Sequence, residues 1–334
     1  MTVAERARAA RGSVNEALVL AAELGRETPL PGQGRTADTW RVLTELATVN
    51  LTVARVIEPH LDALAILDQA GIPHPGNTES SGTWGVFAAE APGLRLEATQ
   101  ASDGTWTLTG TKPWCSLADH LDHAVVTAHV DGGRRAFAVS LRAGGVTPEP
   151  ATGWVSRGLP LVTSCSVRFE DVTAQPVGGT DWYLRRDGFA WGGIGVAACW
   201  YGGALGVART LLAAAARRSP DQIALMHLGR VDTVLHGTRI LLAEAAAAVD
   251  SGRAGGEDGA LLASRVRATA FSCAEVVLET AAHGLGPAPL AFDDEHAARV
   301  ADLHLYLRQH HAERDDAALG RRILGLSEQG ETAW

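Results

Sequence analysis

The chain has 334 residues, of which 46% are hydrophobic and 20% are charged, and its formal net charge at pH 7 is −9. A chain of this length exceeds the usual size of one domain, so two or three subdomains are expected. The acidic balance argues against nucleic acid or an anionic membrane as the main partner, because phosphate binding requires a basic surface.

Cysteine spacing and the N-terminal segment favour a reduced, cytoplasmic protein. The cysteines are far apart and form no CxxC pair. They are Cys115, Cys165, Cys199 and Cys273. The N-terminal segment mixes Arg and Glu with apolar residues, so it lacks the continuous apolar run of a signal peptide or a membrane span. Lys112 is the only lysine among the 29 basic residues.

The first part of the chain is expected to be a helical domain, residues 1–78. Apolar residues recur at helical spacing from about Val3 to Leu24, and Gly25 is a typical helix stop. A second helical region runs from about residue 37 to residue 71. We expect a break at Pro59, because proline disrupts the interior of a helix. The segment IPHPGNTESSG that follows is typical of a linker.

Residues 79–180 are expected to form an antiparallel β domain. Short runs with strand-like alternation begin at Thr83 and end near Pro176. The pair Asp103-Gly104 lies between two such runs, which is a strong hairpin signal. No helix of useful length fits this part of the chain.

Residues 181–334 are expected to form a four-helix bundle. Four helical segments cover residues 197–218, 223–249, 260–283 and 296–324, with Gly- and Pro-containing breaks between them. Long helices with short connections indicate an antiparallel bundle. The predicted fold class is therefore α+β: N-terminal helices, a middle antiparallel β domain and a C-terminal four-helix bundle.

This order, together with the segments LTGTKPWCS, VRFEDV and AAHGLGPAP, resembles the acyl-CoA dehydrogenase family over most of the chain. The resemblance implies a flavoprotein with FAD as cofactor, shortened in its N-terminal domain. Where the family has NGTKxWIT, this chain has TGTKPWCS. The resemblance places Trp114 near the isoalloxazine and Ser116 at the flavin N5 edge, with Cys115 between them. An aromatic wall excludes water, and a hydroxyl tunes the flavin; a core aromatic at a strand end is the alternative for Trp114.

Two further family segments are only partly matched. FAAEAPGLR at residues 87–95 corresponds to FALTEPGAGSD, which implies flavin contact through the backbone of Ala89, Glu90 and Ala91. The arginine that reaches the FAD pyrophosphate in the family corresponds to Arg217 or Arg218, without the FG pair that follows it there. The glycines at the adenine end correspond to Gly284 and Gly286, for which a helix stop is an equal alternative.

The carboxylate base of the family has no counterpart. Aligning Asp302 with the Asp of the family's RDAR stretch puts Gln309 and His310 where the YE pair should be. The first bundle helix also lacks an acid in the run 188–206. His310 is therefore the candidate catalytic base, since imidazole titrates near neutral pH. A shifted register would bring in Glu313 instead, and an exposed charged helix face is the alternative for this segment.

Three functions follow from these observations. The first is Cα–Cβ oxidation of an acyl thioester with hydride transfer to FAD N5. The second is a flavin-dependent oxidase or oxygenase of the same fold in specialised metabolism. The third is a non-catalytic subunit of a heteromeric dehydrogenase, or a flavin-free scaffold, so enzyme activity itself stays uncertain at this point.

The expected partners are a small-molecule substrate and other subunits. The family completes its FAD site across subunits, so we expect a homodimer, a homotetramer or a heteromer with a related chain. We expect no metal site: the cluster at residues 119–123 is better explained as a solvated turn, because nothing else converges on it at ligand spacing.

Overall fold

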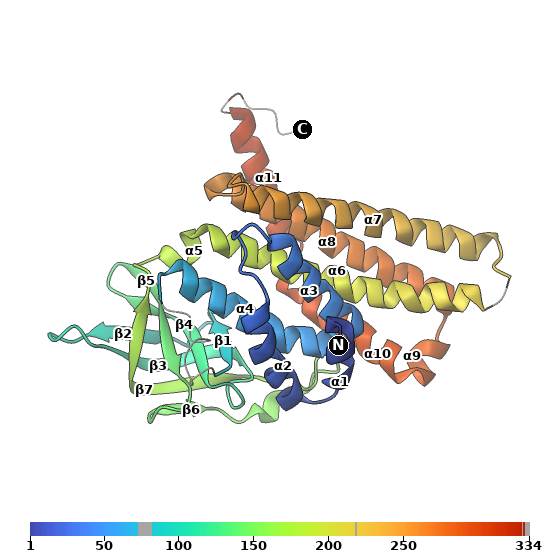
Figure 1. Ribbon diagram of the computed structural model, residues 1–334. Coiled ribbons are helices and arrows are strands. Elements are labelled where there is room, and N and C mark those ends of the chain that lie inside the picture. The colour runs from blue at the N-terminus through green and yellow to red at the C-terminus, as the bar shows by residue number, and fades with distance from the viewer. Residues whose placement is uncertain (73–81, 218, 329, 331–334) are drawn as a thin grey trace. The chain divides into compact units, whose positions relative to one another are not determined.

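The computed structural model describes residues 1–72, 82–217, 219–328 and 330 (Figure 1). Two compact units make up the chain. Unit 1 comprises Met1–Leu30, Thr52–Ser156 and Pro160–Phe189, and unit 2 comprises Pro31–Leu51, Arg157–Leu159 and Ala190–Trp334. Of the expected domain boundaries, residue 78 lies outside the described residues, as does most of the expected linker.

The N-terminal region forms two helices where one was expected. They are α1, Val3–Ala9, and α2, Val14–Glu27. Ser13 begins the second helix by accepting a hydrogen bond from the backbone N–H of Glu16. The expected stop at Gly25 is wrong, because α2 continues through it. A Cβ at Gly25 would lie 2.6 Å from His60 Nε2, so this glycine permits close packing of two helices.

The expected break at Pro59 is also wrong. Helix α3, Thr36–Val49, ends at Asn50, which is extended with φ −157° and ψ 121°. Helix α4 then runs without interruption over Leu51–Gln69, with Pro59 inside it. An interior proline costs about 3 kcal/mol, but most side chains of α4 are buried, and this burial outweighs the lost hydrogen bond.

Seven strands form the sheet of unit 1. They are β1 Trp84–Phe87, β2 Leu96–Gln100, β3 Trp106–Ser116, β4 His123–Val130, β5 Gly133–Ser140, β6 Val146–Pro148 and β7 Ser164–Val177. The order is β1-β4-β2-β3-β7-β5, with β6 on β7 and an additional β4–β5 pairing that closes five strands into a ring. Most pairs are antiparallel as predicted, but β1 and β2 each pair with β4 in parallel.

The core of unit 1 forms where helix α4 packs on the sheet. Ala63, Leu64, Ile66 and Leu67 belong to one buried cluster with side chains of the strands. The strand members of this cluster are Trp84, Val125, Ala136, Ala138 and Val177. A short helix, α5 Trp182–Arg185, adds Tyr183 to it. This packing holds α4 against β1, β4, β5 and β7. Strand β7 in turn pairs with β3, which carries the predicted flavin residues of the sheet.

Unit 2 contains the helical bundle. Its members are α6 Asp187–Ala216, α7 Gln222–Asp250, α8 Gly256–Leu285, α9 Ala288–Phe292, α10 Asp294–Tyr306 and α11 Glu313–Glu328. Helix α7 packs on α8 and α3, and α11 packs on α8. Among the described helices, α6 is long and apolar enough to cross a membrane by length and composition. However, 67% of its most apolar window is buried inside the protein, as in the core helix of a bundle.

The last expected helix, residues 296–324, is broken in two. A short 3-10 turn at Leu307–Gln309 follows α10, and α11 begins only at Glu313. Ala312 has a left-handed backbone with φ 46°, and the Asp315 carboxylate accepts a hydrogen bond from the backbone N–H of His311 at 3.1 Å. These local interactions end one helix and begin the next, which a hydrophobic period alone does not reveal.

Candidate functional site

Strand β3 presents an exposed tryptophan in a strained conformation. The pairing of β3 with β7 shifts register between Lys112 and Cys115. Trp114 lies in this irregularity with φ 58°, and it is 60% exposed. A left-handed backbone costs a non-glycine residue about 1–2 kcal/mol. A strained backbone at an exposed aromatic residue points to a ligand-binding surface rather than to core packing.

The start of this segment is fixed by Gly110. Its φ is 122°, and a Cβ there would lie 2.2 Å from the carbonyl oxygen of Arg95. The next residue, Thr111, donates its backbone N–H to that same carbonyl at 2.8 Å. Only glycine permits this approach, so Gly110 sets where β3 leaves its regular pairing with β2.

Lys112 anchors the segment from inside the unit. Its ammonium donates to Glu90 Oε1 at 2.7 Å and to Thr127 Oγ1 at 2.9 Å, and the side chain is 1% exposed. Burial lowers the pKa of Lys112, and the Glu90 carboxylate opposes this shift. Burial also disfavours the charged form of Glu90, but the hydrogen bonds from Lys112 and His129 hold its pKa below the ordinary value. Each partner therefore favours the charged form of the other.

Ser116 ends the strand with two polar neighbours. Its hydroxyl lies 2.7 Å from the hydroxyl of Ser164, the residue directly opposite in β7. Arg55 of helix α4 donates to the same oxygen from Nη2 at 3.4 Å. The Nη1 atom of Arg55 lies 3.8 Å from Glu58 Oε2. Ser116 thus belongs to a polar cluster built by one helix and two strands of unit 1.

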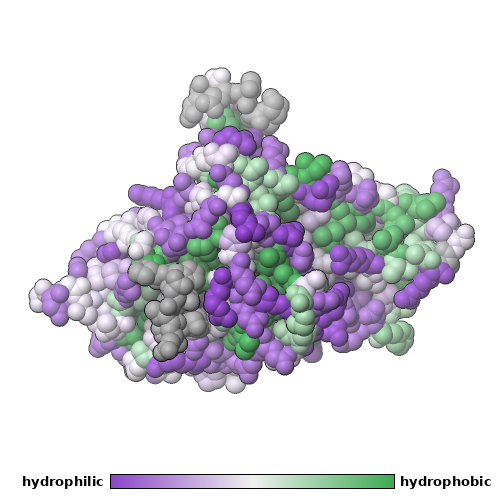
Figure 2. Space-filling view, in the orientation of Figure 1, coloured by the Kyte–Doolittle hydropathy of each residue, from purple (hydrophilic) through white to green (hydrophobic). Residues whose placement is uncertain are grey.

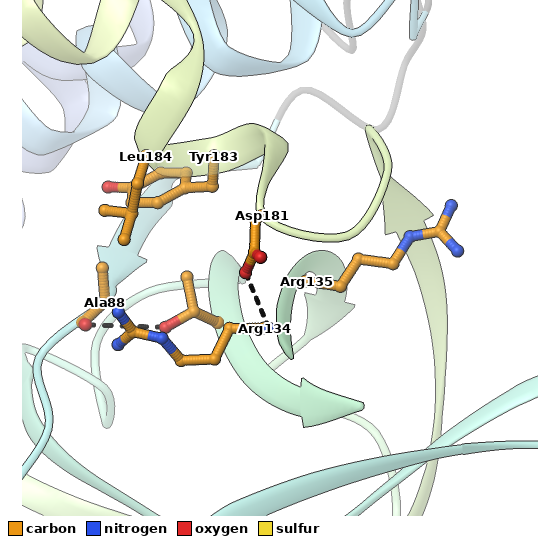
Figure 3. A pocket seen from close by; sticks show the side chains of 7 residues that line it. Ala88, Arg134, Arg135, Asp181, Tyr183 and Leu184 are labelled. Atoms are coloured by element: carbon orange, nitrogen blue, oxygen red, sulfur yellow. Dashed lines mark hydrogen bonds between the residues drawn. The ribbon is translucent and has the colours of Figure 1, made fainter. Parts of the chain in front are cut away.

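A hollow lies beside the Lys112–Glu90 pair. Its volume is about 260 Å³, which includes the solvent space at its mouth. Figure 3 shows Arg134 lying along this hollow and Arg135 pointing away from it. The Asp181 carboxylate accepts a hydrogen bond from the backbone N–H of Arg134 at 3.0 Å, and Arg134 Nη1 lies 3.5 Å from Glu90 Oε1. These contacts fix the position of Arg134 in the wall of the hollow. No ligand is assigned to the hollow.

In unit 2, the loop at residues 310–312 holds the candidate base. The His310 ring is 4% exposed, stacks on Phe271 with a centroid distance of 4.4 Å, and meets Trp200 edge-on. Its Nδ1 accepts a hydrogen bond from the backbone N–H of Ala312 at 3.1 Å, so the neutral ring carries its proton on Nε2. That Nε2 atom lies 3.8 Å from Asp315 Oδ2. Burial lowers the pKa of His310, and Asp315 opposes the shift.

Comparison by sequence finds neither a matching family model nor a matching curated protein. Comparison by structure is informative. The glutaryl-CoA dehydrogenase of Mycobacterium smegmatis superposes with a TM-score of 0.78 and 19% identity, covering 99% of this chain and 95% of that one. TdsC of Paenibacillus sp. A11-2, in complex with FMN and indole, gives a TM-score of 0.79 and 16% identity, with coverage of 97% and 95%.

The chain adopts the acyl-CoA dehydrogenase fold. A third structure of this kind is KijD3 in complex with FMN and a dTDP-linked amino-keto sugar, with a TM-score of 0.76, 19% identity and coverage of 97% and 86%. The same fold therefore occurs in a dehydrogenase of a CoA thioester and in proteins that bind FMN together with chemically different ligands. At such low identities the comparisons establish the fold of this chain, and the predicted architecture is confirmed.

Within this fold, the predicted residues of unit 1 lie as follows. Trp114 is exposed and Ser116 is half-buried at the end of β3, whereas Cys115 between them is fully buried. Ala89 and Glu90 are exposed, and Ala91 accepts a backbone hydrogen bond from Leu94 at 3.3 Å. The Glu90 side chain is engaged by Lys112. The remaining backbone groups of this loop, rather than its carboxylate, are the part that fits a flavin contact.

The residues predicted for the pyrophosphate and adenine end lie in unit 2. Arg217 is exposed after the end of α6, and Arg218 lies outside the described residues. Gly284 packs near Leu211, where a Cβ would lie 2.8 Å from Cδ1. Gly286 is the C-cap of α8, with φ 65° and its N–H donated to Ala282. Both glycines have a helix-end role here, and their contact with a cofactor stays a prediction.

The donor set at β3 fits the isoalloxazine of a flavin. Such a ring needs an apolar surface to stack against and polar groups at its N5 edge. Trp114 supplies an uncovered aromatic surface, and Ser116, which is half-buried, supplies a hydroxyl two residues later on the same strand. The described residues hold no group of three His, Cys, Asp or Glu side chains that could bind a metal ion.

Sequence reasoning missed Arg55 and Ser164. Arg55 lies in a helix whose other side chains are largely apolar, and a basic residue there is itself a signal. Ser164 has no such signal, because only the register of β3 with β7 places it opposite Ser116. Strand pairing across 48 residues is a long-range property that local patterns do not encode.

Proposed function

We propose that the protein is a flavin-dependent oxygenase or oxidase built on the acyl-CoA dehydrogenase fold, and that its flavin is FMN. When bound and reduced, the flavin would supply the two electrons that activate molecular oxygen; the substrate of an oxidase, or a separate flavin reductase for an oxygenase, would deliver those electrons to it. In this proposal Trp114 covers one face of the ring and excludes water. Ser116 donates a hydrogen bond at the N5 edge, and the substrate is a small molecule.

The observation that carries this proposal is the loop at residues 310–312. Dehydrogenation of an acyl thioester requires a base with a free lone pair to remove the α proton. His310 uses its Nδ1 lone pair to accept the Ala312 N–H, and its ring is buried against Phe271. Glu313 is exposed at the first turn of α11. Neither residue offers a positioned base, whereas flavin-based oxygen activation does not require one there.

The choice of FMN over FAD rests on the adenine-end residues. Gly284 and Gly286 are accounted for by helix packing and capping, and the expected FG pair after Arg217 is missing from the sequence. The FMN complexes of TdsC and KijD3 show that proteins of this fold bind the shorter cofactor.

The test compares two reactions of the flavin-loaded protein. We expect no anaerobic bleaching of the bound flavin by acyl-CoA thioesters of different chain lengths. After chemical reduction, we expect mixing with oxygen to reoxidise the flavin faster than it reoxidises free FMN. Stopped-flow absorbance follows both steps. Rapid bleaching by any acyl-CoA would instead establish dehydrogenation and overturn the proposal.

We also propose that two copies associate through unit 2. Hydrophobic side chains gather on the surface of its helices, as Figure 2 shows. The large hydrophobic side chains that are exposed on α6 and α7 include Leu212, Ile223, Leu225, Met226 and Ile240. Exposed apolar patches of this kind mark protein interfaces. Light scattering after size exclusion should give twice the 35.0 kDa chain mass or a multiple of it, and Met226→Glu should shift the particle toward the monomer.

A further inference from the structure

The hydroxyl of Ser116 has one proton to donate and two lone pairs to accept with. Arg55 approaches it with a guanidinium nitrogen at 3.4 Å. Because a guanidinium has donors only, this contact always occupies a lone pair of Ser116. The Ser164 hydroxyl at 2.7 Å can be either donor or acceptor. The hydrogen bond from Arg55 to Ser116 therefore has a fixed direction, whereas in the Ser116–Ser164 bond either hydroxyl can be the donor.

A ligand atom bound to Ser116 determines which of the two hydroxyls donates. With an accepting ligand atom, Ser164 donates to Ser116 and Ser116 donates to the ligand, so two donors polarise the hydroxyl that makes the contact. With a donating ligand atom, Ser116 accepts from both the ligand and Arg55 and donates its own proton to Ser164, so the ligand's positively polarised hydrogen lies beside the guanidinium. The positive charge of Arg55 favours the first arrangement, because a cation stabilises electron density on the accepting atom.

We infer that Arg55 and Ser164 are positioning residues that hold the Ser116 hydroxyl as a hydrogen-bond donor to an accepting atom at the N5 edge of the flavin. The inference rests on the proposed flavin binding. Arg55 reaches the site from helix α4, whose packing on the sheet is part of the core of unit 1. The Glu58 carboxylate lies 3.8 Å from Nη1 of Arg55 and offsets part of its positive charge. The electrostatic potential at Ser116 therefore depends on both side chains.

Two consequences can be measured without turnover. The first is selectivity between FMN and analogues that lack an acceptor, namely 5-deaza-FMN, which has carbon at position 5, and 4-thio-FMN, which has sulfur in place of O4. A hydrogen bond from a hydroxyl that two donors polarise predicts that one of these analogues binds roughly 10-fold more weakly than FMN. The second is the midpoint potential of bound FMN, which the Arg55 cation should raise, because reduction adds electron density to the ring.

The variants separate the contributions of the cluster. Ser116→Ala should bring the ratio of analogue to FMN dissociation constants close to one. Arg55→Met should reduce that ratio to a few-fold and lower the midpoint potential, whereas Arg55→Lys should restore both. Ser164→Ala should reduce the ratio by a smaller factor, and Ser166→Ala, on the same strand, is its matched control. Arg41→Met, an exposed arginine on α3, controls for charge removal.

Loss of Arg55 leaves Glu58 in a buried position, so Arg55→Met could fold poorly. Glu58→Gln provides the second measurement, since it keeps Arg55 and removes the nearby negative charge. It should raise the midpoint potential, opposite in sign to Arg55→Met. If the analogue ratio is near one in the wild type, or if Glu58→Gln leaves the potential unchanged, the inference is wrong while FMN binding still stands. If the wild type binds no flavin, the proposed function and the inference are both wrong.

Discussion

The Lys112–Glu90 pair shows how one residue holds the candidate site in place. The ammonium of Lys112 is almost fully enclosed, and Glu90 is its charged partner. Removing one partner of a buried ion pair typically costs about 3–5 kcal/mol, because the other charge is left without compensation. The Glu90 side chain is 34% exposed, so water can replace part of its contribution, and the expected cost is smaller.

We therefore expect Glu90→Gln to reduce the free energy of unfolding by about 1–3 kcal/mol. The double variant Glu90→Gln/Lys112→Met should be more stable than Glu90→Gln alone, because it also removes the uncompensated ammonium. Chemical denaturation followed by circular dichroism measures both. Simple additivity of the two single changes would contradict an energetic coupling between these side chains.

His310 makes a pH-dependent contribution to stability. Burial lowers its pKa in the folded state, so between pH 6.5 and that lower pKa the unfolded chain binds a proton that the folded protein does not. The free energy of unfolding should therefore fall as the pH decreases below about 6.5. Burial also lowers the pKa of His123 and His296, which add to the decline.

His310→Phe keeps an aromatic ring against Phe271 and removes the titrating group. We expect the variant to lose less stability than the wild type between pH 6.5 and pH 5, measured by denaturant unfolding at each pH. His311→Phe is the matched control, because the neighbouring ring is 65% exposed. Equal pH slopes for wild type and His310→Phe would show that His310 titrates alike in the folded and unfolded states.

At the scale of an element, the path of strand β3 beside β2 depends on one glycine, Gly110. A Cβ at Gly110 would approach the Arg95 carbonyl oxygen to 2.2 Å at φ 122°. Gly104, in the turn before β3, also has a positive φ of 89°, but its nearest neighbour atom would be 4.0 Å away. The two positions separate the cost of the backbone conformation from the cost of a steric clash.

We expect Gly110→Ala to cost about 3 kcal/mol or more, because strain and overlap combine. Gly104→Ala should cost about 1–2 kcal/mol, the price of the left-handed backbone alone. Thermal unfolding of the two variants provides the comparison. If Gly110→Ala is no worse than Gly104→Ala, then β2 and β3 can separate at low cost, and the position of Trp114 is not set by this contact.

The same scale shows where local patterns predict structure and where they fail. The hairpin at Asp103-Gly104 and the long bundle helices follow from periodicity and turn residues, and the structure contains them. Pro59 was expected to break a helix, but tertiary burial overrides local preference there. The break at residues 310–312 depends on a hydrogen bond from the backbone N–H of His311 to the Asp315 carboxylate, which hydrophobic spacing cannot predict.

At the scale of the whole molecule, the order of elements predicted the fold, whereas the composition of the two units could not be predicted. Residues 31–51 belong to unit 2 because Asp250 of α7 binds the backbone N–H groups of Gly34 and Thr36. Residues 157–159 join the same unit through a hydrogen bond from Leu159 N–H to the buried Asp302 carboxylate. Contacts between residues so distant in the sequence leave no local signal. The candidate site shows the same limit, since Trp114 follows from a motif and Arg55 does not.

The choice between FMN and FAD also determines which segments of the whole molecule the cofactor protects from hydrogen exchange. A ligand that binds only the folded state stabilises it by about 2.7 kcal/mol at 100 times its dissociation constant. The amide protons it shields exchange more slowly. If the flavin is FMN, slower exchange should appear at residues 110–117 and at Ser164. It should be absent at residues 284–286, because capping and packing already account for Gly284 and Gly286.

Hydrogen exchange with mass spectrometry, in the presence of saturating FMN or FAD, tests this expectation. Both cofactors should protect residues 110–117, and Ser116→Ala should weaken that protection, since the hydroxyl contact is lost. FAD should add no protection at residues 284–286 beyond that of FMN, if its adenine finds no partner there. Strong protection of this segment by FAD alone would establish an adenine site at the end of α8 and would contradict the assignment of FMN.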